Sequence, residues 1–346
     1  MRDAFEVVEA IIGYGSMALV IVTLPIYILV IVVLLKSRST SGTNNLFFRI
    51  YLIGGIIDVI SMLNNYLGSI FPARGYFLSY YLSSPTTGKI YLSLAWGTRM
   101  CQGCTVLLLA VNRTTAVVNP AKYQKMWSGC MGYATIAIQI VPGIVMGGAI
   151  WLSKYEWITK DNGSYYIQFV DAKFRLNYFM AAFCLQVILM SSIAGNYVTV
   201  YVVYRQKYKL IVTPIDLRMR SLAAEKQKQE ARLFFISLVV CTMEMVCFLF
   251  SFYCFVINTN VPTRVFYLVY NCMNDVYAAV PPYLLILFST PFKRRLASFL
   301  GLDKQHKTSA VSLIHPAGRS TTPNCGTSAN AGRPLTRQDI TVTIVN

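Results

Sequence analysis

The chain has 346 residues, of which 55% are hydrophobic and only 13% are charged. This charged share is about half of that in ordinary soluble domains, so a water-soluble fold of this size could not cover its surface. The two histidines, His306 and His315, lie near the polar C-terminus, which excludes His-centred triads and His-rich metal sites from the apolar part. The net charge of +17 would suggest nucleic acid only if the chain were soluble. The composition therefore predicts a polytopic membrane protein that does not bind nucleic acid.

Seven apolar segments predict seven transmembrane helices. Each is longer than 20 residues, and a helix satisfies its own backbone hydrogen bonds in lipid. The segments cover residues 10–35, 46–70, 90–118, 130–152, 176–204, 233–257 and 265–288. Pro25, Pro142, Pro281 and Pro282 lie inside them, and we expect these prolines to bend the helices rather than end them. The predicted fold class is an all-α membrane protein built as a seven-helix bundle.

The distribution of charge gives this bundle an orientation. Acidic residues precede the first span, and Lys36 and Arg38 follow it, so residues 1–9 are expected to lie outside the cell. Most of the 31 lysines and arginines then fall on the cytoplasmic side, as the positive-inside rule requires. The sequon at Asn162 falls in an outer loop and predicts a glycosylation site there.

Two further segments follow the seventh span. Residues 290–301 place Phe292, Leu296 and Phe299 on one side and a basic cluster on the other, which predicts an amphipathic helix at the inner membrane surface. Residues 302–346 are rich in Ser, Thr, Gly and Pro, and this composition predicts a disordered cytoplasmic tail.

Four ionisable residues lie near the middle of the predicted spans: Asp58, Arg99, Glu244 and Asp275. A charge at this depth costs at least about 2.5–3.5 kcal/mol, so each side chain should face the bundle interior. Arg99 can pair with one or two of the three acids, so at least one carboxyl must be protonated, bind a cation or meet a ligand. The three acids form a candidate intramembrane charge site or sodium-like site.

The sequence allows two interpretations of Arg99. It forms a structural charge pair that determines how the helices pack, or it anchors an anionic group of a small ligand. In the second case Arg99, Gln102, Asn271 and Asp275 form the candidate ligand-binding set. The alternative role of the amides Gln102 and Asn271 is hydrogen bonding between helices.

The nine cysteines do not predict a disulfide or a metal site. All but Cys325 lie in or at the ends of the apolar spans, and none lies in an outer loop. Cys101 and Cys104 have the spacing of a metal or redox pair, but no second pair exists in a polar setting. We therefore expect no disulfide, no metal and no cofactor.

The predicted inner face is basic. Arg113 ends the third span and is either an interfacial side chain or, in a seven-span receptor, a residue that holds the inner ends of the third and sixth helices together. The stretch 220–232 consists of strong helix formers and should extend the sixth span inward. The basic residues of this face serve either anionic lipid or a cytosolic partner: Arg113, Lys122, Lys125, Arg218, Arg220, Lys226 and Lys228.

Five motifs are distinctive: FFRIYLIGGIIDVI at 47–60, NNYLG at 64–68, FPARG at 71–75, LAWGTRMCQG at 94–103 and LLLAVNR at 107–113. They resemble the nematode serpentine receptor class gamma (Srg) family, and the resemblance extends from the first span to the helix that begins at Pro291. It implies a GPCR-like chemoreceptor that detects a small environmental or pheromone-like molecule and signals to a heterotrimeric G protein through the basic inner residues.

The same resemblance implies location in the plasma membrane, at a sensory-neuron cilium, with arrestin and kinases as further partners at the tail. Asp58 is placed like the sodium-site aspartate of rhodopsin-like receptors. Arg113 is similar to the arginine of their Asp-Arg-Tyr motif, although Asn112 and Thr114 replace its neighbours.

A protein of another class is the alternative to a receptor. An ion channel or a transporter would use the intramembrane acids as an ion path. The absence of an internal repeat argues against an inverted-repeat transporter. No nucleophile–base pair is visible in the sequence, so we do not expect an enzyme.

Overall fold

The computed structural model describes residues 2–36, 46–159, 165–210, 217–257 and 262–302. They belong to one compact unit, which ends at Leu302. The candidate glycosylation site Asn162 and the predicted tail beyond Leu302 lie outside the described residues.

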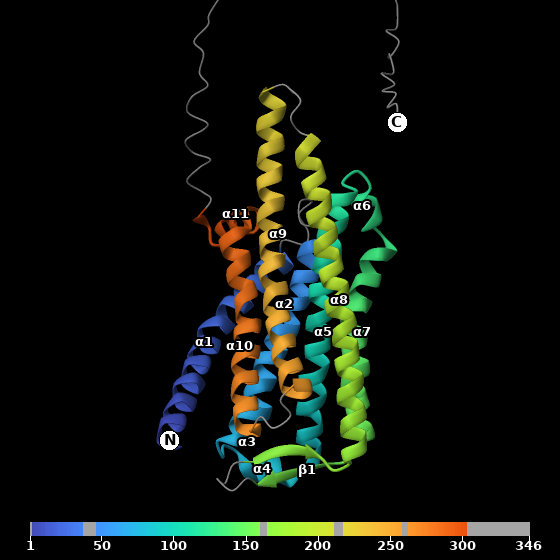
Figure 1. Cartoon of the computed structure of the whole chain (residues 1–346). Helices are drawn as coiled ribbons and strands as arrows, with labels where there is room; N and C mark the ends of the chain where they lie inside the picture. Colours follow the sequence, from blue (N-terminus) through green and yellow to red (C-terminus); the bar gives the residue numbers. More distant parts are fainter. Residues whose placement is uncertain (1, 37–45, 160–164, 211–216, 258–261, 303–346) are drawn as a thin grey trace, which may run out of the picture. The chain divides into compact units, whose positions relative to one another are not determined.

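Seven long helices form the bundle in the described part of the chain (Figure 1). Their bounds are α1 Arg2–Lys36, α2 Leu46–Asn65, α5 Pro85–Val118, α7 Cys130–Ala149, α8 Ala172–Leu210, α9 Leu217–Phe252 and α10 Thr263–Phe288. Pro25, Pro142, Pro281 and Pro282 lie inside helices that continue past them. α9 includes the stretch 220–232, as predicted.

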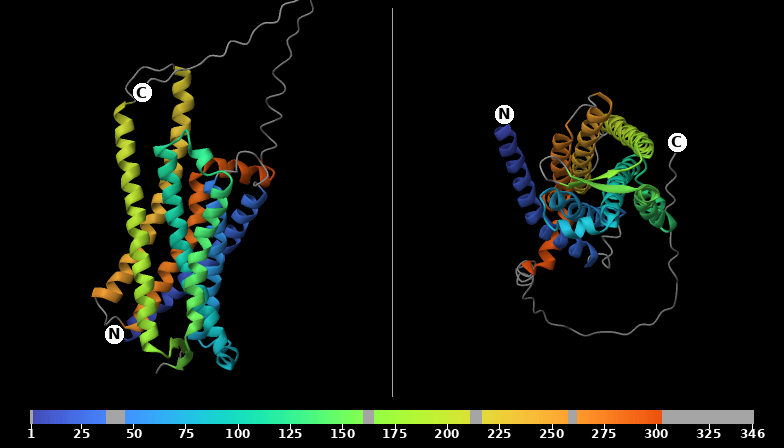
Figure 2. Two further views of the ribbon diagram at one scale, coloured as in Figure 1. Left: turned by 90° about the vertical axis from the view of Figure 1, so that its right-hand side faces the viewer. Right: turned by 90° about the horizontal axis from the view of Figure 1, so that it is seen from below.

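Short elements connect or extend these helices. They are η2 Tyr66–Ile70, α3 Phe71–Ala73, α4 Leu78–Ser83, α6 Tyr123–Met126, η3 Ile150–Leu152, β1 Tyr155–Thr159, β2 Tyr165–Phe169, η4 Tyr253–Ile257 and α11 Thr290–Phe299. α3, α4 and the strands lie at the end of the bundle that the charge pattern predicts to be outside, and α6 and α11 lie at the opposite end (Figures 1 and 2).

Six of the described helices are long and apolar enough to cross a membrane by length and hydropathy alone. α10 is not among them, although it lies beside α1 and α9 in the bundle. Its sequence explains this, because Asn271, Asn274 and Asp275 interrupt the apolar run. The apolar segment 265–288 predicts this seventh helix, and its packing beside α1 and α9 places it in the bundle although its most apolar stretch is less hydrophobic than those of the other six.

Glycines allow α5 and α7 to pack with their backbones in contact. A Cβ atom added to Gly143 would lie 2.4 Å from the carbonyl oxygen of Gly97 and 2.1 Å from Sγ of Cys101. A Cβ atom on Gly147 would lie 2.6 Å from the carbonyl oxygen of Ser93. Small residues at such positions let transmembrane helices approach closely, where dispersion forces hold them together.

The segment between α7 and α8 contains a two-stranded antiparallel sheet, which the all-α prediction missed. Tyr155 pairs with Phe169 and Trp157 with Ile167 in its register, and the hairpin lies across the end of the bundle (Figure 2). The Tyr155 hydroxyl donates a 2.8 Å hydrogen bond to the carbonyl oxygen of Ile150. Burial raises the pKa of Tyr155, so the hydroxyl keeps the proton that it donates.

At the opposite end α11 lies across the helix termini (Figure 1). Its Phe292 is fully buried, and the Ser289 hydroxyl caps the helix by accepting a hydrogen bond from the Phe292 N–H. Arg232 of α9 donates a 2.7 Å hydrogen bond to the Thr290 hydroxyl. This contact joins the inner part of α9 to α11.

Candidate functional site

A cavity of about 1210 Å³ lies between the helices and the hairpin. Its wall is rich in aromatic side chains from α5, α8, α9 and α10: Trp96, Phe179, Phe183, Phe248 and Tyr270. The hairpin contributes Trp157, Ile167 and Phe169. Ligand sites in proteins are typically concave and largely apolar, with a few polar groups that orient the ligand, and this cavity has that character.

Six charged residues line the cavity: Glu6, Glu9, Arg74, Arg99, Arg175 and Asp275. Arg74 and Glu6 are exposed, whereas the side chain of Arg99 is 14% exposed and Asp275 is fully buried. The candidate ligand residues Arg99, Asn271 and Asp275 thus reach one cavity, and they do so from α5 and α10.

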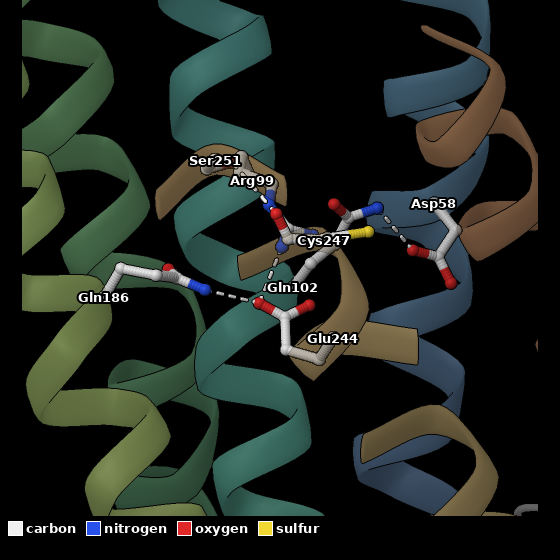
Figure 3. A network of polar contacts seen from close by, with 7 residues as sticks. All are labelled: Asp58, Arg99, Gln102, Gln186, Glu244, Cys247 and Ser251. Carbon is white, nitrogen blue, oxygen red and sulfur yellow. Dashed lines mark hydrogen bonds and ion pairs between the residues drawn. The ribbon is translucent and has the colours of Figure 1, made fainter. Parts of the chain in front are cut away.

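Of the three intramembrane acids, Glu244 is the one that forms an ion pair with Arg99. Its Nη2 lies 2.7 Å from Oε1 of Glu244, and the Glu244 side chain is fully buried. The same oxygen accepts a 2.6 Å hydrogen bond from Nε2 of Gln186, and Figure 3 shows both donors pointing at this carboxyl. The Arg99 guanidinium also lies 5.3 Å from the ring centroid of Tyr277. The pair joins α5 to α9, and Gln186 adds α8.

Gln102 points away from this pair, toward Asp58 (Figure 3). Its Nε2 donates a 2.8 Å hydrogen bond to Oδ1 of Asp58, and the Tyr27 hydroxyl donates a 2.5 Å bond to Oδ2. Both Gln102 and Asp58 line a separate small cavity of about 20 Å³. Gln102 therefore acts between helices in this structure and does not line the large cavity with Arg99.

Asp275 has hydrogen-bond partners that differ from those of the other two intramembrane acids. Nδ2 of Asn65 lies 2.9 Å from its Oδ1, and the Tyr66 hydroxyl lies 3.2 Å from its Oδ2. Asn271, one helical turn earlier, donates a 3.5 Å hydrogen bond to the Ser69 hydroxyl. These contacts join α10 to the end of α2 and to η2.

The candidate sodium-like site is not assembled as one cluster. Asp58, Glu244 and Asp275 each have their own hydrogen-bond partners. Within the described ranges, no group of three His, Cys, Asp or Glu side chains is placed to hold a metal ion.

Arg113 is buried at the inner end of α5. It is 3% exposed, its guanidinium lies 4.6 Å from the ring centroid of Phe47, and its Nη2 donates a 2.9 Å hydrogen bond to Oδ1 of Asn112. Asn112 in turn donates a 2.9 Å bond to the Tyr123 hydroxyl of α6. Arg113 is thus packed against α2 and linked through Asn112 to α6.

The structure describes the side chains of only some of the other basic candidates on this face. Lys122 directly precedes α6 and Lys125 lies within it, and both are exposed. The backbone at 218, 220, 226 and 228 belongs to α9, whereas the side chains of Arg218, Arg220, Lys226 and Lys228 lie outside the described part of the structure.

Comparison with known proteins identifies the family. A sequence model of the serpentine type 7TM GPCR chemoreceptor Srv family matches residues 16–302. The chain belongs to the Srv family. It is 26% identical over 312 residues to serpentine receptor class V-1 of Caenorhabditis elegans, which covers 87% of this chain and 94% of that protein. The chain is thus a multi-pass membrane chemoreceptor of the GPCR type.

The solved structure of squid rhodopsin has the same fold as this Srv protein. The TM-score is 0.66 at 14% sequence identity, over 90% of this chain and 93% of the rhodopsin chain. This likeness confirms the predicted seven-helix, GPCR-like bundle.

Assignment to class gamma is wrong, because the family match and the curated relative both identify class V. The motifs behind that assignment contain residues that pack the bundle, such as Phe47, Asp58 and Gln102, each less than a tenth exposed. Buried residues of this kind report the fold more than the receptor class. Both classes are nematode seven-helix chemoreceptors, so the prediction of a chemoreceptor is unaffected.

Proposed function

We propose that this Srv receptor detects a small molecule in the large cavity and signals to a heterotrimeric G protein at the opposite, basic end. The single observation that carries the proposal is the cavity of about 1210 Å³ at the hairpin end of a chemoreceptor bundle. Its volume suits a small organic ligand. Asn271 and Asp275 are the proposed polar contacts with that ligand. Arg99 lines the same cavity while paired with Glu244.

Signalling requires that the ligand prefer one of two conformations of the bundle. A full reversal of populations needs about 5.5 kcal/mol of difference in binding free energy between the two states. Arg113, Lys122, Lys125 and the inner part of α9 form the proposed G-protein surface. The proposed orientation, with the N-terminus outside, rests on the charge pattern. The proposed location in the plasma membrane rests on membership of a chemoreceptor family.

A second-messenger assay tests this function. Cells that express the receptor are exposed to a panel of small organic compounds, and ligand-dependent nucleotide exchange on the G protein is measured. The same cells without G proteins are tested for ion flux. Exchange that depends on a compound supports the receptor; ion flux without exchange would show a channel or a transporter instead.

Charge reversal at the inner surface tests the proposed G-protein contact. Lys122→Glu combined with Lys125→Glu should lower the rate of nucleotide exchange by roughly three- to tenfold, because complementary charges at an interface rim accelerate association. Both side chains are exposed, so the fold is expected to be unaffected. Lys173→Glu is the matched control, since Lys173 is exposed at the first turn of α8, near the hairpin. Equal loss of exchange in the control would argue against a specific contact.

A further inference from the structure

We propose, on the basis of the function above, that the cavity selects ligands with a protonated amine, and that this amine pairs with the carboxylate of Asp275. The inference depends on a difference between two intramembrane acids: Asp275, which lines the cavity, and Glu244, which pairs with the lining residue Arg99. Glu244 has a cation beside it, whereas Asp275 does not.

Asp275 is held only by neutral donors among the described residues. Asn65 and Tyr66 each donate one hydrogen bond to it, and no lysine or arginine pairs with it in that part of the chain. A carboxylate at mid-membrane without a cation is costly. A positively charged group in the adjacent cavity would remove this cost, and binding of a cation would therefore be favoured at this position.

Arg99 is less suited to hold an anionic ligand. Its guanidinium is already neutralised by Glu244 at 2.7 Å. An anion that displaced Glu244 would leave that fully buried carboxylate without its partner, and breaking a buried pair in this way is strongly unfavourable. Arg99 is thus a structural cation, and of the two intramembrane charges that line the cavity Asp275 is the one left for a ligand.

An amine reaches Asp275 by displacing the Tyr66 hydroxyl. Asp275 is fully buried, but it borders the cavity. The Tyr66 oxygen lies 3.2 Å from Oδ2, at the long end of hydrogen-bond distances, so this bond is the weaker of the two. A charge-assisted bond from an ammonium group is stronger than the bond it would replace.

The rest of the cavity fits the same class of ligand. Trp96, Phe179, Phe183, Phe248 and Tyr270 provide apolar surface for a ring or a hydrocarbon body. Aromatic faces also attract cations. The expected ligand is therefore an amine attached to an aromatic or other apolar body.

Binding of matched compounds to the purified full-length receptor in lipid nanodiscs tests the proposal. The first probes are 2-phenylethylamine, 2-phenylethanol and phenylacetate, which are a cation, a neutral alcohol and an anion with the same ring. Tryptamine, tryptophol and indole-3-acetate repeat these three charge states on a larger ring. We expect each amine to bind at least about tenfold more tightly than its alcohol and its acid. In Asp275→Asn this preference for the amine should disappear, and Asp275→Glu should restore part of it.

Two further variants separate recognition from folding. Tyr66→Phe removes the competing hydroxyl and should strengthen amine binding by about two- to tenfold, which a merely damaged fold would not do. Asp58→Asn changes an intramembrane acid outside the large cavity and should leave the preference unchanged.

Several results would overturn the inference. They are equal binding of amine and alcohol to the wild type, an unchanged preference in Asp275→Asn, and binding of none of the six compounds. A receptor that responds to acids or alcohols but not to amines would refute the proposed selectivity for amines, while the proposed receptor function would stand. Ion flux without nucleotide exchange would refute the proposed function itself.

Discussion

Glu244→Ala should lower the free energy of unfolding by about 3–5 kcal/mol. The substitution leaves Arg99 with its charge inside the bundle, and the guanidinium cannot lose its proton to escape that cost. It also removes the acceptor of the Gln186 hydrogen bond, so the contact of α9 with both α5 and α8 is weakened. Thermal unfolding of the purified receptor in one detergent measures the change.

The reverse substitution, Arg99→Ala, provides an internal comparison. It leaves Glu244 buried, but a carboxyl can take up a proton and become neutral, so the loss should be smaller than in Glu244→Ala. The double variant Arg99→Met with Glu244→Leu removes both charges and should recover most of the lost stability. Wild-type stability in Glu244→Ala would contradict the structural role of the pair.

Gly143→Ala should lower the free energy of unfolding by roughly 3 kcal/mol. The added Cβ atom would lie 2.4 Å from the Gly97 carbonyl oxygen and 2.1 Å from Sγ of Cys101. The first of these is a backbone atom and cannot rotate away, so α5 and α7 must separate along their contact. The loss of close packing reduces the dispersion energy that holds the two helices together.

Gly148→Ala is the matched control for this substitution. Gly148 lies in the same helix, and a Cβ atom added there would have nothing within 4 Å outside its own helix. Alanine is a better helix former than glycine, so this variant should be neutral or slightly more stable. Equal stability of the two variants would show that the α5–α7 contact is looser than the glycines indicate.

The sequence by itself determined the general architecture of this protein. Apolar run length and charge are local properties, so the seven-helix bundle, the helical extension at 220–232 and the continuation of helices past Pro25 and Pro142 could be read without coordinates. The depth of Asp58, Arg99, Glu244 and Asp275 followed from their places in the spans. The cost of charge in lipid then required them to face inward.

The hairpin was missed, although its signal is present in the sequence. Tyr155–Thr159 and Tyr165–Phe169 are rich in aromatic and β-branched residues, and Asn162-Gly163 stands between them. This combination is typical of a β-hairpin. Each strand has only five residues, too few to span a membrane, so apolar run length does not detect the hairpin.

Only the tertiary structure decided how the polar side chains are paired. Arg99 meets Glu244, which is 145 residues away in the chain, and Gln102 turns to Asp58 rather than to the cavity. These outcomes depend on the rotation of each helix about its axis and on the distance between segments, and a sequence states neither. The same geometry leaves Asp275 beside the cavity with neutral partners, because its side chain meets Asn65 of α2 and Tyr66 of η2 rather than a basic side chain.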